Sequence, residues 1–103
     1  MQSMSMKYDL EFTPEADEQL ENLEESKKKK AACKAVHKAL SYMETNLKHP
    51  SLQTHSYSEL KGVHGEKVYE SYAQNKTPGA YRIFWHYGPR TRQITIVSIL
   101  PHP

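Results

Sequence analysis

The sequence predicts a single α+β domain, in which a helical hairpin packs on one face of a small, twisted and mainly antiparallel sheet. Three observations support this fold class. The chain has 103 residues, enough for one domain with a modest core. Two stretches with apolar residues at three- and four-residue spacing follow each other closely, as in a pair of helices. Alternating apolar and polar residues lie on both sides of these stretches, so the predicted order is β-α-α-β-β-β.

The first strand and the first helix are predicted within residues 8–25. Residues 8–12 (YDLEF) alternate apolar and acidic side chains, which is typical of a half-buried strand. Thr13 and Pro14 mark a helix start, because threonine caps a helix and proline fits its first turn. Residues 1–6 are expected to be a loose extension of the domain. The apolar face of the helix consists of Ala16, Leu20 and Leu23.

A second helix is predicted to begin after Ser26, whose side chain can cap it. The four lysines at positions 27–30 oppose the helix dipole, and the acids Glu24 and Glu25 lie close enough to offset them. Pro50 marks the end of this helical region, because proline cannot continue a helix. The apolar stripe of the helix consists of Ala32, Val36, Leu40, Met43 and Leu47.

Three further strands are predicted in the second half of the chain, at residues 67–73, 80–87 and 93–100. The connectors between them, NKTPG and GPRTR, have the length and the Gly and Pro content of hairpin turns. The preceding segment is rich in polar residues and contains two glycines. It is predicted to be a polar loop over residues 51–66.

Charge is distributed unevenly along the chain. Residues 1–25 carry one lysine against eight acids, a net charge of −7. Residues 26–103 carry 13 Lys and Arg against four acids, a net charge of +9. A basic body with one acidic element indicates a polyanionic partner. The alternative is that two charged helices neutralise each other in the hairpin.

Composition argues against several classes of protein. No apolar run is long enough to span a membrane, and the first ten residues lack the apolar segment of a signal peptide. Cys33 is the only cysteine, which excludes an internal disulfide and indicates a reducing, cytoplasmic location. The histidines have neither cysteine partners nor close paired spacing, so neither a metal site nor a cofactor is predicted.

One arginine lies within the aromatic and apolar stretch GAYRIFWHYG, residues 79–88. Alternation along this strand places Ile83 on the face that packs against the helices, and Arg82 and His86 on the opposite, open face. We therefore expect Arg82 to be exposed on a rigid strand that holds its guanidinium in place. The alternative is that it forms a surface salt bridge to Glu70 across the hairpin.

The order of elements, the YRIFW strand, the LKG turn before the sheet and the histidine of the final PHP together resemble the RelE/ParE toxin superfamily. The resemblance covers nearly the whole chain and implies a RelE-like fold and a toxin of a bacterial toxin–antitoxin system. It is closer to the RelE, YoeB and HigB branch, whose members are ribosome-dependent endoribonucleases that cut mRNA and so inhibit translation. ParE members instead poison DNA gyrase and need no catalytic residues.

The resemblance also implies roles for individual residues. Arg82 matches the arginine that contacts the scissile phosphate, and His102 resembles the terminal histidine of the YoeB and HigB types. Glu59, in the segment SELK, resembles a YoeB-like general base. Two features of the YoeB type are absent: the proline that follows the glutamate, and the terminal tyrosine.

The chemistry of metal-free RNA cleavage fits the same residues. It requires a base for the 2′-hydroxyl, positive charge on the phosphorane and an acid for the 5′ leaving oxygen. The Arg82 guanidinium suits the second role, and His102 can exchange a proton near neutral pH. Glu59 or His64 is the candidate base. Candidate RNA-binding residues are cationic or aromatic: Lys61, Lys67, Arg90, Arg92, Tyr57, Tyr69 and Tyr72.

Simpler interpretations exist for these residues. The tyrosines can serve core and hairpin packing, and His102 can belong to a frayed tail. At the level of function, three interpretations stay open: an mRNA endonuclease, a ParE-like inhibitor of DNA gyrase, and a degenerate toxin that only binds its antitoxin. The expected partners are an antitoxin protein, mRNA and the ribosome, with no membrane, in either a homodimer or a toxin–antitoxin hetero-oligomer.

Overall fold

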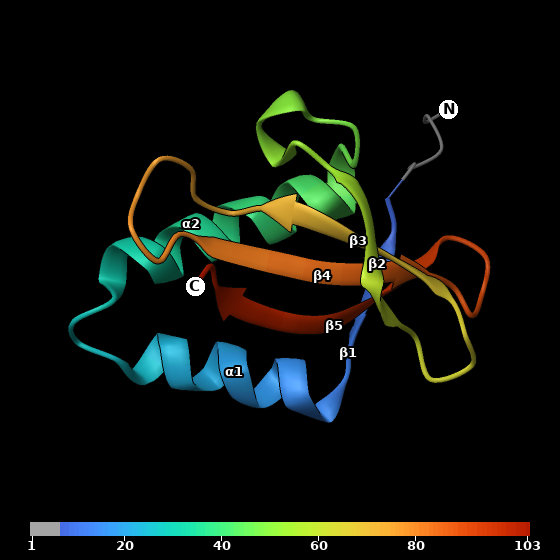
Figure 1. Ribbon diagram of the computed structural model, residues 1–103, viewed down its shortest axis with the longest axis horizontal. Coiled ribbons are helices and arrows are strands. Elements are labelled where there is room, and N and C mark those ends of the chain that lie inside the picture. Colours follow the sequence, from blue (N-terminus) through green and yellow to red (C-terminus); the bar gives the residue numbers. More distant parts are fainter. Residues whose placement is uncertain (1–6) are drawn as a thin grey trace, which may run out of the picture.

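In the computed structural model, which describes residues 7–103, two helices pack on one face of a five-stranded sheet (Figure 1). The strand order is β1-β5-β4-β3-β2, with β1 parallel to β5 and all other neighbours antiparallel. The predicted α+β fold class is therefore confirmed, and the loose extension expected over residues 1–6 lies outside the described part. The elements are β1 (Asp9–Phe12), α1 (Pro14–Glu25), α2 (Lys30–Thr45), a short 3-10 helix (Pro50–Leu52), β2 (His55–Lys61), β3 (Lys67–Tyr72), β4 (Tyr81–Tyr87) and β5 (Gln93–Pro101).

Helix α1 begins where the sequence predicted. The Thr13 hydroxyl oxygen accepts a hydrogen bond from the Ala16 amide at 3.0 Å and donates to the Val97 carbonyl at 2.8 Å. One side chain thus caps α1 and ties it to β5. Pro14 occupies the first helical position, and acidic residues lie in the first turn, where they complement the helix dipole.

The predicted start of the second helix is wrong. Ser26 caps the C-terminus of α1 instead, where its amide donates to the Leu23 carbonyl. Helix α2 begins at Lys30, after Lys29, whose side chain makes no capping hydrogen bond. Three of the four lysines thus precede the helix, which reduces the unfavourable charge in its first turn. The buried residues of α2 are Ala32, Val36, Ala39, Leu40 and Met43; Leu47 lies past the helix and still packs against the core.

The segment predicted to be a polar loop contains the 3-10 helix and the edge strand β2. Strand β2 pairs with β3 only at His55, Ser56 and Lys61, and its register shifts in between. In Figure 1 the strand crosses in front of β3 and β4 instead of extending the sheet flatly. The ring of Tyr57 accordingly lies 4.8 Å from that of Phe84 on β4. Strand β2 therefore partly covers the face of the sheet that the helices leave free.

The main core lies between the helices and the other face of the sheet. The central strands contribute their alternate residues to it, and the helices contribute the apolar faces described above. The sheet residues that are buried in this core are Tyr81, Ile83, Trp85, Ile94, Ile96 and Ile99. Neither helix within residues 7–103 combines the length and apolar character that a bilayer crossing requires.

Candidate functional site

Arg82 lies on the central strand β4 and faces away from the helical core, as the alternation of side chains predicted. It is paired with Tyr72 on β3 and with Leu100 on β5, while its neighbour Ile83 is part of the core. The expected exposure is wrong, because only 9% of the Arg82 surface is accessible. The neighbouring strands supply the groups that bury it.

Three groups surround the Arg82 guanidinium. Its central carbon lies 3.8 Å from the centre of the Tyr72 ring, which is a close cation–π contact. Its Nη1 donates to the Gln74 carbonyl at 2.9 Å. Its Nε lies 3.5 Å from Glu70 Oε2 and is the one buried side-chain nitrogen or oxygen in residues 7–103 without a hydrogen-bond partner. The pair with Glu70 that the sequence offered as an alternative is thus present, but buried instead of at the surface.

Glu70 also contacts a histidine from the edge strand. Its Oε1 lies 2.7 Å from His55 Nε2, and His55 Nδ1 donates to the Gln53 carbonyl at 2.9 Å. Because a carbonyl only accepts, Nδ1 carries a hydrogen, and the imidazole faces Glu70 through its other nitrogen. We call the four side chains that meet here the Arg82 cluster: Arg82, Glu70, His55 and Tyr72.

Of Glu70 and His55, sequence reasoning offered the first as a surface partner of Arg82 and missed the second. Both lie in segments of mixed polarity, and His55 lies within the predicted loop. The available signal was strand alternation, which places Glu70 and Tyr72 of β3 on the same face as Arg82 of β4. The pairing of His55 with Glu70 depends on the register of β2, which no local pattern in the sequence shows.

His102 lies next to the Arg82 cluster in the sheet. Its amide donates to the Ala80 carbonyl at 2.7 Å, which extends the ladder between β4 and β5 by one pair. Since Leu100 is paired with Arg82, His102 lies two residues further on the same face, a spacing of about 7–8 Å in a sheet. Its exposed imidazole lies 3.0 Å from the Pro103 carbonyl through Nδ1. The backbone at His102 is therefore anchored to the central strand.

Tyr57 lies two residues after His55 on β2, and Glu59 lies two residues further along the same strand. The Tyr57 hydroxyl donates to Glu59 Oε1 at 3.4 Å. The pKa of Tyr57 is raised chiefly by the negative charge of Glu59, then by desolvation, and also by the charge of Glu70. The Tyr57 hydroxyl therefore lies within the electrostatic reach of both carboxylates. Glu59 is exposed.

The basic candidates Lys61 and Lys67 lie at the end of β2 and β3 that is away from the Arg82 cluster. Lys61 is paired with Lys67, which is five residues from Tyr72 and thus about 16 Å along the strand. His64 is exposed in the hairpin beyond them, where its amide donates to Glu66. The structure does not bring His64 to the Arg82 cluster.

The remaining RNA-binding candidates also lie away from the Arg82 cluster. Arg90 and Arg92 lie between β4 and β5, at the end of β4 that is opposite Arg82. Tyr69 is on the helix-facing side of the sheet, where its ring stacks on that of Trp85 at 5.0 Å. The ammonium of Lys67 lies 5.5 Å from the centre of the Tyr69 ring. The predicted residues are thus divided between two surfaces.

The Arg82 cluster combines a cation that can bind an anion with imidazole and carboxylate groups. A guanidinium held on a central strand can bind phosphate oxygens, although Glu70 and Gln74 occupy part of it here. Two imidazoles lie beside it: His55 contacts Glu70, and His102 follows two residues after the partner of Arg82. In the part of the chain that the structure describes, no three His, Cys, Asp or Glu side chains form a group that could hold a metal ion.

The fold is similar to those of several solved structures, although no similarity was found at the level of sequence families. No protein-family model matches the sequence, and no curated protein is significantly similar to it. Solved structures with similar folds include the archaeal RelE–RelB complex from Pyrococcus horikoshii OT3, with 15% identity, a TM-score of 0.62 and coverage of 95% of this chain and 96% of that chain. The YoeB dimer from Staphylococcus aureus has 17% identity, a TM-score of 0.59 and coverage of 94% and 99%. A YoeB/ParE toxin from Agrobacterium tumefaciens has 8% identity, a TM-score of 0.65 and coverage of 92% and 99%.

The chain therefore has the fold of the RelE and YoeB toxins over nearly its whole length. This confirms the RelE-like fold that the sequence resemblance implied. At identities of 8–17% the likeness is one of fold.

Proposed function

We propose that this chain, which shares the RelE-like fold, is the toxin of a toxin–antitoxin pair and cleaves mRNA on the ribosome without a metal ion. The observation that carries the proposal is the placement of Arg82 and His102. Arg82 is on β4 and His102 directly follows the neighbouring strand β5, on one face of the sheet and two residue pairs apart. An anion-binding guanidinium and a proton donor are thus held at a spacing that suits a phosphodiester.

In the proposed reaction, the 2′-oxygen attacks phosphorus while the bond from phosphorus to the 5′-oxygen breaks. Arg82 stabilises the charge on the phosphorane, and His102 gives a proton to the leaving 5′-oxygen. The proton of the 2′-hydroxyl passes to Glu59, the candidate base on β2. An incoming phosphate would take the place of Glu70 beside Arg82 Nε, where the present contact is long, at 3.5 Å.

The test is growth arrest combined with mapping of mRNA 5′ ends in cells that express the chain. Wild type should give discrete, ribosome-dependent cuts. His102→Ala should slow cleavage by about 10²–10⁴-fold, the range for loss of one acid–base group, without lowering the melting temperature, because the imidazole is exposed. Arg82→Lys keeps the charge opposite Glu70 but loses the planar fork, so it should abolish cleavage and stay folded. Full cleavage by a folded variant that carries both Arg82→Lys and His102→Ala would refute the proposed site.

A second candidate function rests on the burial of Arg82. Because its guanidinium is already engaged by Glu70, Gln74 and Tyr72, the arginine can be a structural residue of the sheet. The chain would then act as a ParE-like inhibitor of DNA gyrase, or would only bind an antitoxin. Intact mRNA together with DNA damage in the expressing cells would select the gyrase inhibitor.

The proposed partner is an antitoxin with an acidic segment that covers part of the basic body. The net charge of +9 over residues 26–103 supports this, because opposite charge steers association. One similar structure is a complex of RelE with RelB, and another is a YoeB dimer, so we propose a toxin–antitoxin complex or a homodimer in the cytoplasm. Failure to co-purify with the neighbouring gene product at low salt would contradict the antitoxin part of the proposal.

A further inference from the structure

A second surface lies on the helix-facing side of the sheet, at the end away from Arg82. Four aromatic rings meet there, and we call them the aromatic surface: Tyr8, Tyr69, Trp85 and Tyr87. The ring centres of Tyr69 and Trp85 are 5.0 Å apart and stacked, and Tyr87 lies 5.0 Å from Trp85 and 5.7 Å from Tyr69. Tyr8 lies 6.2 Å from Tyr87. Core packing explains Trp85, which is buried, but not Tyr87, which is 48% exposed.

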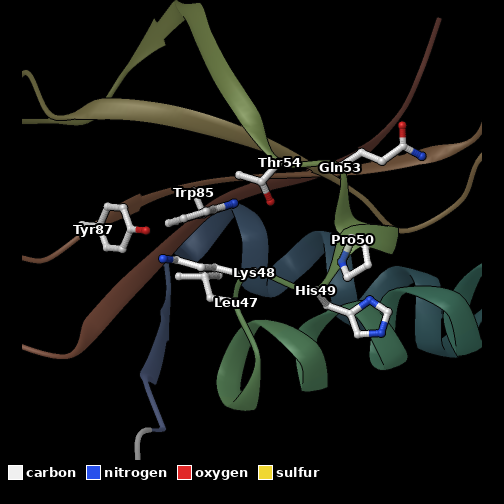
Figure 2. Close-up of a pocket in the computed structure, with 8 residues that line it drawn as sticks. All are labelled: Leu47, Lys48, His49, Pro50, Gln53, Thr54, Trp85 and Tyr87. Carbon is white, nitrogen blue, oxygen red and sulfur yellow. The ribbon is translucent and has the colours of Figure 1, made fainter.

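Tyr87 separates two open pockets. One has a volume of about 260 Å³ and lies between the sheet and the segment that follows α2. In Figure 2 the long side chain of Lys48 reaches across this pocket toward Tyr87 and Trp85. The other has a volume of about 460 Å³ and lies between Tyr8, Tyr87 and the β4–β5 hairpin. The Tyr87 side chain therefore borders open space in both pockets.

Basic side chains line both pockets beside the aromatic surface. Lys48 lines the first pocket, and Arg90 and Arg92 line the second. The Arg92 guanidinium lies 4.9 Å from the centre of the Tyr8 ring, and Lys67 is placed similarly over Tyr69. Among the described residues, no acid lines either pocket. Glu11 Oε2 lies 3.9 Å from Arg90 Nη2, in a pair that is exposed on both sides and therefore weak.

We propose that the aromatic surface binds single-stranded RNA, with a base stacked on Tyr87 and phosphates held by Lys48 and Arg90. An exposed ring beside cations can stack one base and hold the neighbouring phosphates of a single strand. A duplex fits less well, because its base faces are stacked inside. An acidic peptide would use the cations but has no group that requires the exposed ring. The surface is on the opposite face of the sheet from the Arg82 cluster, so the proposal does not depend on RNA cleavage.

Binding can be measured by fluorescence anisotropy with a labelled oligouridylate of about ten nucleotides. Its riboses are 2′-O-methylated, so it cannot be cleaved through a 2′-hydroxyl. We expect Tyr87→Ala to weaken binding by about 5- to 150-fold, the effect of losing one base–aromatic stack. Tyr87→Phe should bind like wild type because it keeps the ring. Tyr87→Leu serves as a second apolar variant without a ring, should Tyr87→Ala fail to fold.

The charge contribution has its own control. Lys48→Ala should reduce the dependence of log affinity on log salt concentration by about 0.7, the value for one phosphate contact on a single strand. Lys34→Ala removes the same charge from the exposed surface of α2 and should leave the slope unchanged. Three results would overturn the proposal: no binding of the single strand at low salt, equal binding of a duplex, or full affinity in both ring-deleting Tyr87 variants. Binding of an acidic peptide without binding of the oligonucleotide would point to a protein partner instead.

Discussion

Replacement of Arg82 by alanine should destabilise the fold, and the structure allows the size of the effect to be worked out. The substitution removes a charged hydrogen bond to the Gln74 carbonyl and the stacking on Tyr72. It also leaves the Glu70 carboxylate buried with only His55 beside it. Breaking a buried ion pair from one side costs about 3–5 kcal/mol. Since His55 at 2.7 Å offsets part of this cost, we expect a loss of about 2–4 kcal/mol.

The source of this loss can be isolated with a double-mutant cycle. In the Arg82→Ala background, Glu70→Gln removes the uncompensated charge and should restore at least ~1 kcal/mol. In the wild-type background the same change removes a partner of Arg82 and should destabilise the fold. Urea denaturation followed by circular dichroism measures all four free energies of unfolding.

In thermal denaturation, Arg82→Ala should lower the melting temperature by about 10–20 °C for a domain of this size. A loss of less than about 1 kcal/mol, or the same cost of Glu70→Gln in both backgrounds, would show that the two residues are not coupled. The reasoning from their buried contact would then be wrong. Because we expect Arg82→Ala to be destabilised, a loss of activity in this variant would not by itself test the role of Arg82 in cleavage. If the loss of stability proves small, Arg82→Ala can be used for that test.

Three further predictions concern separate parts of the fold. Ile83→Ala should lower the free energy of unfolding by about 2–5 kcal/mol, because it opens a cavity in the fully buried core; a urea midpoint close to wild type would contradict this. Thr13→Ala should cost about 0.5–2 kcal/mol in the same assay, since it removes the cap of α1 and its bond to Val97; an effect no larger than that of Glu21→Ala, a change at an exposed position of α1, would argue against the cap. The pKa of Glu66 is lowered below its usual 4.5 by the backbone amides of Glu66 and His64. The contribution of the Glu66 carboxylate to stability should therefore be present above pH 4.5 and disappear as the pH falls through the lower, folded-state pKa. Glu66→Gln should remove this part of the acid dependence. Urea unfolding of both proteins above and below pH 4.5 would test this, and an unchanged acid dependence in the variant would contradict it.

Local signals in the sequence were sufficient for the parts of the fold that are locally determined. Thr13 and Pro14 predicted the start of α1, because a cap and a first-turn proline act within one turn. The start of α2 was missed, because Lys29 makes no capping bond that a residue type could reveal. Strand β2 was missed because it is a polar, irregular edge strand whose pairing shifts between Ser56 and Lys61.

The same distinction applies to the candidate site. Alternation along one strand predicted which way Arg82 points, since that depends only on its own backbone. Its burial depends on Glu70 and Tyr72 from β3, and His55 joins through β2. These contacts are set by the register between strands, which a single sequence does not encode in any short pattern. A strand that was missed thus led directly to a site residue that was missed.

The position of β5 has a consequence for how the chain folds during synthesis. This strand follows every other described element in the chain, yet it lies between β1 and β4 and ties the first strand to the rest of the sheet. While the ribosome has not yet released residues 93–101, β1 has no partner and the core lacks Ile94, Ile96 and Ile99. Pairing of elements so distant in the chain is also slow, because a long loop must close first. Until this strand has emerged from the ribosome, the sheet is incomplete and the ladder that positions His102 beside Arg82 cannot form.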